Sequence, residues 1–204
     1  METNFLSRVK RHSFSFKEQL IEPDCFHPLA PREIHRKLHL VQLTHLDFKS
    51  RVCPGEIVVH TLALDLIEQF FKTAFEIGFP IHSVIPLHHK PFNSEEYWSD
   101  DISMELNNSS GFNYRKKTHK DELSPHALGL AFDINPVLNP FLVSHRVYPQ
   151  NGSYDPEQPG TLTQGHPLVE LCLNQGWKWG GHFVECKDYH HFEKESYLGY
   201  TPES

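Results

Sequence analysis

The chain has 204 residues, of which 38% are hydrophobic, 12% aromatic and 22% charged. This composition is typical of a globular protein and excludes a disordered or fibrous one, and the length predicts a single domain. The net charge of −7 argues against nucleic acid or an anionic membrane as the main partner. Apolar runs are too short for a membrane span. The start METNFLSRVKRHSFSFKEQL lacks an apolar core, so we expect no secretory signal peptide.

The first half of the chain predicts an irregular arm, two strands and a helix. Residues 1–30 are expected to be irregular, because prolines punctuate them and periodicity is weak. Nearly alternating apolar residues predict a strand over 37–48, and 55–60 could form a second strand or lead into the next element. Apolar residues at intervals of three and four predict a core-facing helix over 60–78, ended by Gly78 and Pro80.

The second half predicts shorter elements separated by polar loops. Expected strands lie at 81–87, 111–115, 128–136, 177–183 and 187–193. Helices are expected at 101–108 and 166–175, and a long loop rich in Pro, Asn and Gly at 137–165. Short strands mixed with few helices predict an α+β fold with one domain.

Two segments carry side chains suited to metal chemistry. In the first, S-P-H-A-L-G-L-A-F-D, His126 and Asp133 flank a glycine in an apolar stretch, so a buried Asp133 needs a cation or several donors. The second, D-Y-H-H-F-E, clusters titratable groups from Asp188 to Glu193. Catalytic zinc takes three ligands from His, Asp, Glu or Cys and leaves one position for water. Two ligands from the first segment and one from the second would satisfy that rule.

The spacing alone leaves alternatives open. His126 and Asp133 could instead form a structural hydrogen-bonded pair, with the C-terminal histidines on the surface. Nothing in the spacing decides between His190 and His191 as the third ligand.

The two segments and a third one resemble a known family. S-P-H-A-L-G-L-A-F-D resembles the S-x-H-x-x-G-x-A-x-D motif of the M15 zinc peptidases, which include peptidoglycan D,D-carboxypeptidases and L-alanyl-D-glutamate endopeptidases. W-G-G followed by D-Y-H-H-F-E is similar to that family's C-terminal segment, and N-S-S-G-F-N-Y-R resembles its arginine-bearing strand. The resemblance covers roughly residues 80–195 in family order. It implies an M15-like peptidase domain at 56–204, preceded by an unassigned arm and first strands at 1–55.

The resemblance implies a fold and a set of site residues. The fold would be that of hedgehog and D,D-peptidase domains, a small antiparallel sheet with helices packed on one side. His126, Asp133 and His191 would bind Zn²⁺, and His191 is preferred because it occupies the H-F-E position. Asp188 would be the general base and acid. Arg115 would have an electrophilic or substrate-carboxylate role, although it could also be a strand-end residue paired with a surface acid.

Other residues are expected to support the ligands or contact substrate. They are Ser124, His190 and Trp179, and Ser124 could equally begin a turn. One departure from relatives is His182-Phe183 after the two glycines, where an acidic residue and a tryptophan are common. This pair affects the expected specificity rather than the metal chemistry.

The implied activity is zinc-dependent hydrolysis of a peptide bond in peptidoglycan stem peptides or muropeptides. The aspartate at 188 and the W-G-G segment resemble the endopeptidase branch, which implies cleavage between L-Ala and D-Glu. The alternatives are a D,D-carboxypeptidase that releases terminal D-Ala, and a non-catalytic zinc-containing module such as the hedgehog signalling domains. We expect a monomer that acts in the periplasm, outside the cell, after lysis, or on muropeptides in the cytoplasm.

Overall fold

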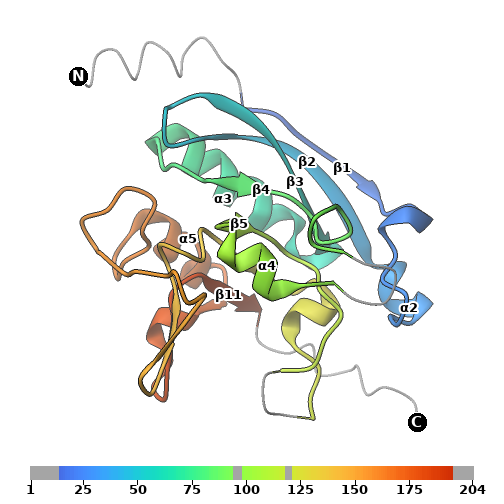
Figure 1. Cartoon of the computed structure of the whole chain (residues 1–204). Coiled ribbons are helices and arrows are strands. Elements are labelled where there is room, and N and C mark those ends of the chain that lie inside the picture. Colours follow the sequence, from blue (N-terminus) through green and yellow to red (C-terminus); the bar gives the residue numbers. More distant parts are fainter. Residues whose placement is uncertain (1–13, 94–97, 118–120, 195–204) are drawn as a thin grey trace.

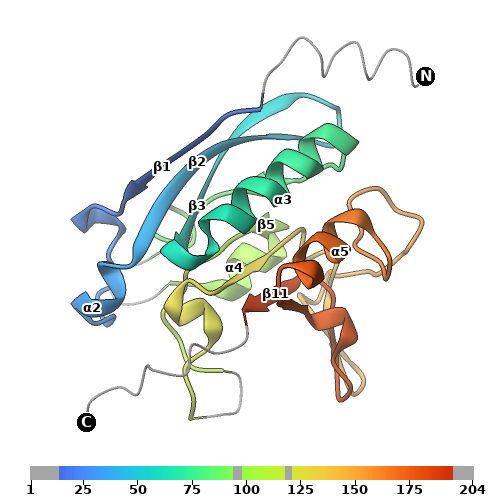
Figure 2. The same cartoon turned by 180° about the vertical axis from the view of Figure 1, so that it is seen from behind.

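The polypeptide folds into layers with one long helix between two groups of strands. The computed structural model describes residues 14–93, 98–117 and 121–194. Helix α3 (Leu64–Ile77) lies between an N-terminal sheet and the C-terminal elements, which include α5 (Pro167–Asn174) and β11 (His191–Lys194) (Figures 1 and 2). The α+β class expected from the sequence is therefore confirmed.

The N-terminal sheet is antiparallel in the order β1-β2-β3. Its strands are β1 (Phe16–Leu20), β2 (Leu38–Leu46) and β3 (Val52–His60). The strands expected at 37–48 and 55–60 are confirmed, and the expected domain boundary at residue 55 lies within β3. The irregular arm expected at 1–30 is wrong for 16–20, because β1 pairs along its whole length with β2. Residues 1–13 lie outside the described residues.

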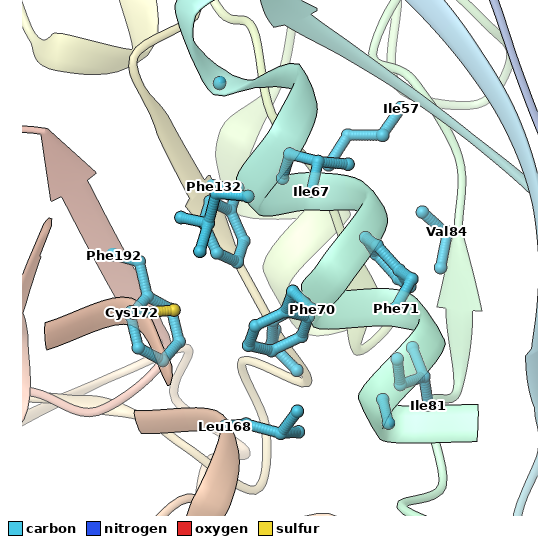
Figure 3. Close-up of a cluster of buried hydrophobic side chains, with 14 of the residues drawn as sticks. Ile57, Ile67, Phe70, Phe71, Ile81, Val84, Phe132, Leu168, Cys172 and Phe192 are labelled. Carbon is cyan, nitrogen blue, oxygen red and sulfur yellow. The ribbon is translucent and has the colours of Figure 1, made fainter. Parts of the chain in front are cut away.

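Three short helical turns and α3 complete this half. The turns are η1 (Pro23–Cys25) and α2 (Arg32–His35), and η2 (Thr61–Ala63) leads into α3. The expected helix is confirmed, because Leu66, Ile67, Phe70, Phe71 and Ala74 form a buried face along it. This face packs against the sheet and against the strands of the C-terminal half (Figure 3).

The middle of the chain holds a parallel pair and a short helix. Strands β4 (Ser83–Val84) and β5 (Asn108–Ser109) pair in parallel, and α4 (Asp100–Glu105) confirms the helix expected near 101–108. The strand expected at 111–115 is wrong. That segment lies between two isolated bridges, Ser110 to Asp133 and Lys116 to Leu123, and forms no continuous ladder.

The C-terminal half contains two further three-stranded antiparallel sheets. One has the order β6-β11-β9, with β6 (Ala131–Asp133) and β9 (Trp177–Trp179); the other has the order β10-β7-β8. The second contains β7 (Phe141–Val143), β8 (Arg146–Tyr148) and β10 (Lys187–Asp188). The long loop expected at 137–165 is therefore wrong in part, because β7 and β8 form a hairpin within it. The turns η3 (Pro125–Leu128) and η4 (Gly180–His182) and helix α5 complete this half.

The expected single antiparallel sheet is thus divided into several small sheets, and α3 is covered on two sides. No helix among the described residues is long and apolar enough to cross a bilayer. The four cysteines are all free thiols.

Candidate metal centre

Two neighbouring strands place a carboxylate and an imidazole side by side. Strands β6 and β11 are antiparallel, and their register sets Asp133 opposite His191. Successive side chains of a strand point to opposite faces. Phe132 and Phe192 therefore point the other way, stack on each other and pack against Phe70 of α3 (Figure 3). Because these phenylalanines are buried, the two strands are held in place. The opposite face of the same strands carries Asp133 and His191.

A short helical turn brings the second imidazole to the same place. Ser124 caps η3 by accepting a hydrogen bond from the backbone N–H of His126 at 3.3 Å. Gly129 ends the turn in the left-handed conformation, with φ of 68°. A Cβ at this position would lie 2.5 Å from Leu38 Cδ2 and 2.7 Å from the backbone nitrogen of His60. Glycine therefore permits both the turn and its close contact with the N-terminal sheet.

The three predicted ligands meet in one buried cluster. His126 Nε2 lies 3.1 Å from His191 Nδ1 and 3.3 Å from Asp133 Oδ2, and His191 Nδ1 lies 3.0 Å from Asp133 Oδ1. The three residues are 3%, 8% and 3% exposed for His126, His191 and Asp133. Their three ligand atoms all lie within 4.8 Å of one another, which is close enough to hold one metal ion, and among the described residues this is the group of His, Cys, Asp or Glu side chains that meets this condition.

The outer nitrogens of both imidazoles already have hydrogen-bond acceptors. His126 Nδ1 donates to the backbone oxygen of Gly111 at 2.6 Å, and His191 Nε2 donates to Glu193 Oε2 at 3.2 Å. These partners set the tautomers, so His126 Nε2 and His191 Nδ1 both direct lone pairs towards the centre of the cluster.

This donor set fits zinc. Two facing lone pairs and a carboxylate need a cation between them, because otherwise they repel one another in a buried site. Although burial disfavours the charge, the neighbouring histidines hold the pKa of Asp133 well below its usual range. Burial also opposes protonation of His191, but its hydrogen bonds to Asp133 and Glu193 raise its pKa to about 10, so a proton on Nδ1 competes with a metal ion for that nitrogen. Two imidazole nitrogens and one carboxylate oxygen match the three protein ligands of a catalytic zinc site.

Asp188 is connected to the cluster through His190. His190 Nε2 lies 3.0 Å from Asp188 Oδ1 and 4.0 Å from Asp133 Oδ1, while His190 Nδ1 donates to the backbone oxygen of Asn139 at 2.8 Å. Burial opposes its charge, but Asp188 and Asp133 raise the pKa of His190 to about 9. Gly180 of the W-G-G segment packs closely against Asp188, because a Cβ there would lie 2.7 Å from the Cβ of Asp188.

Arg115 lies close enough to the cluster for its guanidinium to interact electrostatically with the carboxylates there. Burial disfavours its cation, but the carboxylates of Asp100, Asp133 and Asp188 raise the pKa of the guanidinium. Its NH2 group lies 2.6 Å from Asp100 Oδ2, and its buried Nε has no hydrogen-bond partner. The backbone N–H of Ser124 donates to the carbonyl of Arg115 at 3.0 Å, which ties this segment to the first ligand motif.

The other expected residues lie around the cluster in different roles. Trp179 is buried, and its Nε1 donates to the backbone oxygen of Tyr189 at 2.9 Å. This hydrogen bond stabilises the segment between Asp188, the expected base, and His191, the third expected ligand. The ring of Phe183 lies 6.3 Å from that of His191, and His182 packs edge-on against Trp179 at 5.2 Å. The departure from relatives at 182–183 therefore lies beside the metal centre.

Two partners of site residues were not predicted from the sequence. Asp100 comes fifteen positions before Arg115, and no local pattern connects the two. The carbonyl of Gly111 is a backbone group without a side-chain signal. The role of Glu193 could have been found, because a strand places residues two apart on one face and Glu193 follows His191 at that spacing.

One comparison with known proteins gives a match, and it covers the region that contains this cluster. Residues 117–194 match the model of an M15 peptidase family described as D-alanyl-D-alanine carboxypeptidase. The matched segment contains the three expected ligands and Asp188, and Arg115 lies just before it. The match supports a peptidase of the M15 type. Searches of curated proteins and of solved structures gave no match.

Proposed function

We propose that this chain is a zinc-dependent peptidase that hydrolyses a peptide bond in the stem peptides of peptidoglycan. The observation that carries the proposal is the buried group of His126, Asp133 and His191, with the Asp188 carboxylate joined to it through His190. The M15 family match over the same residues supports this reaction class.

The residues around the centre have different roles in hydrolysis. When bound, zinc supplies the Lewis acidity that polarises the scissile carbonyl and lowers the pKa of a water molecule. Asp188 takes the proton of the attacking water and passes it to the departing amine. His190 is fixed by the backbone carbonyl of Asn139 and lies within ion-pair distance of Asp188 Oδ1, a buried oxygen that has no hydrogen-bond partner and can accept the proton of the water. Arg115 stabilises negative charge that develops on the carbonyl oxygen, a contribution of about 3 kcal/mol for one donor.

We propose the bond between L-Ala and D-Glu as the one that is cut. A carboxypeptidase needs a cation free to bind the terminal carboxylate of its substrate. The NH2 group of Arg115 already contacts Asp100 at 2.6 Å, which leaves the unpartnered Nε. One donor is enough for a carbonyl oxygen but not for a bidentate pair with a terminal carboxylate. The aspartate at 188 and the W-G-G segment support the same choice, because both resemble the endopeptidase branch.

A D,D-carboxypeptidase is the second candidate, and the description of the matching family favours it. In that case the substrate carboxylate must displace Asp100 from Arg115. Asp100→Asn would then lower the KM for substrates with a free C-terminus, because the competing charge is removed.

Mass spectrometry of defined muropeptides tests the proposal. Zinc-loaded protein is incubated with muropeptides that carry a pentapeptide stem, and Asp188→Asn, which keeps the shape of the side chain, is the matched control. We expect cleavage between L-Ala and D-Glu by the wild type and loss of this cleavage in the control. Release of D-Ala alone would identify the carboxypeptidase. Intact stems with zinc bound would favour a non-catalytic module.

A further inference from the structure

A pocket lies beside strand β8, at the edge of the sheet β10-β7-β8. Its volume is about 470 Å³, and it is lined by Arg146, Val147, Tyr148 and Gln150. Pockets that bind small ligands have volumes of about 300–1,000 Å³, so this one is large enough for part of a peptide. Strand β8 pairs with β7 on one side, and its outer backbone groups pair with no further strand of that sheet. None of the residues that line the pocket takes part in the metal centre described above.

The strand register connects this pocket to the expected catalytic base. Asp188 of β10 pairs with Phe141 of β7, and Phe141 pairs in turn with Tyr148 of β8. Residues that lie directly opposite each other in an antiparallel sheet have their side chains on the same face. The rings of Phe141 and Tyr148 stack with 6.0 Å between their centroids, which agrees with this arrangement. Asp188, Phe141 and Tyr148 therefore form one row across a single face of the sheet.

Arg146 adds a positive charge at the far end of this row. It precedes Tyr148 by two positions in the same strand, so the two side chains lie on the same face. Arg146 is exposed, and it has no ion-pair partner among the residues that the structure describes. A guanidinium without a partner at a pocket is suited to a carboxylate, because its fork of donors fits both carboxylate oxygens.

The distance from the base to the pocket corresponds to about three residues of a substrate. Neighbouring strands lie about 4.8 Å apart, so the two steps from Asp188 to Tyr148 cover about 10 Å. An extended peptide rises about 3.3 Å per residue, so about three residues span the same distance. In a carboxypeptidase substrate the terminal carboxylate belongs to the residue directly after the cleaved bond, which is too close to the base to reach Arg146. A substrate with three residues after the cleaved bond places its terminal carboxylate at this pocket.

We propose that the pocket beside β8 is a substrate subsite, in which Arg146 binds the free C-terminal carboxylate of a stem tetrapeptide. This subsite rests on the proposed function, because cleavage between L-Ala and D-Glu leaves three residues after the cleaved bond. The half-buried rings of Phe141 and Tyr148 cover the apolar parts of those residues. Gln150 supplies a side-chain amide for hydrogen bonds to the peptide backbone. Arg146 thus determines specificity at a distance from the reacting atoms.

Calorimetry with two matched peptides tests the subsite, because binding is measured without turnover. The probes are the stem tetrapeptide with a free C-terminal carboxylate and the same peptide with a C-terminal amide. Zinc-loaded Asp188→Asn serves as the background, so that neither peptide is cleaved. We expect the acid to bind about 5- to 10-fold more tightly than the amide, as for one charge-assisted pair. Arg146→Gln should abolish this preference, Arg146→Lys should retain part of it, and Arg36→Gln, at the exposed end of α2, should leave it unchanged.

The outcomes separate the subsite from the proposed cleavage. Equal affinities for acid and amide would overturn the subsite, even if the wild type cuts the bond between L-Ala and D-Glu. A preference for the acid that persists in Arg146→Gln would also overturn it and would assign the carboxylate to another cation. If the wild type cleaves no stem peptide, the proposed function fails, whereas a preference lost in Arg146→Gln would still support the carboxylate site. Should Arg146→Gln fail to fold, Arg146→Lys and the comparison of the two peptides in the unchanged pocket decide the question.

Discussion

Replacing Glu193 with alanine is expected to weaken zinc binding at the candidate metal centre by about 10- to 100-fold, which corresponds to about 1.4–2.7 kcal/mol. Glu193 Oε2 accepts a hydrogen bond from His191 Nε2 at 3.2 Å. This bond keeps the proton on the outer nitrogen and leaves Nδ1 free for the metal. Without it, the ring of His191 can rotate or change tautomer, and its nitrogen becomes a weaker base.

The magnitude follows from the place of this hydrogen bond. The carboxylate side chain is only 22% exposed, and His191 and neighbouring lysines lower its pKa although burial opposes this. It is therefore a charged acceptor in a partly dry site, where such a bond is stronger than one on the surface. Because the three ligands themselves are untouched in the variant, the loss should stay well short of the loss caused by His126→Ala.

The assay is competition for zinc with a chelator of known affinity. Glu193→Gln keeps an acceptor but removes the charge, so its affinity should fall between those of the wild type and the alanine variant. Glu170→Ala, on the exposed face of α5, is the matched control and should bind zinc like the wild type. If Glu193→Ala folds normally and binds zinc as tightly as the wild type, the proposed tautomer of His191 is wrong.

Three further predictions concern catalysis and stability. Asp188→Ala should keep zinc but lose about 100- to 10,000-fold in kcat, and a wild-type rate would exclude it as the base. Gly129→Ala should cost at least about 2 kcal/mol in urea denaturation, because its Cβ would clash, whereas Gly176→Ala has open space and should lose less. Burial, then His35, lowers the pKa of His27 to about 4. The contribution of this residue to stability is therefore complete above about pH 6.5 and is lost towards pH 4, by at most about 1.4 kcal/mol per pH unit; a pH profile that is unchanged in His27→Phe would contradict this.

The longest elements could be predicted from the sequence because they bury a regular apolar pattern. Helix α3 and strands β2 and β3 follow this rule, and the core confirms it. Strand β1 could not be predicted, since four of its five residues are exposed and its order depends on pairing with β2. The hairpin of β7 and β8 was missed for a similar reason, because its residues are only partly buried and lie within a segment rich in turn residues.

The three candidate metal ligands could be predicted because their motifs are local, and the structure brings His126, Asp133 and His191 together although spacing alone left His190 open as an alternative. The partners that orient these residues come from distant parts of the chain. The pairing of Arg115 with Asp100 depends on how α4 packs, which no local pattern determines.

A crystal structure of the zinc-loaded protein tests the central claim most directly, with anomalous scattering measured on both sides of the zinc absorption edge. The account predicts an anomalous peak bonded to His126 Nε2, Asp133 and His191 Nδ1, with the outer nitrogen of His191 still bound to Glu193. Zinc-loaded crystals in which these three side chains hold no metal would contradict it.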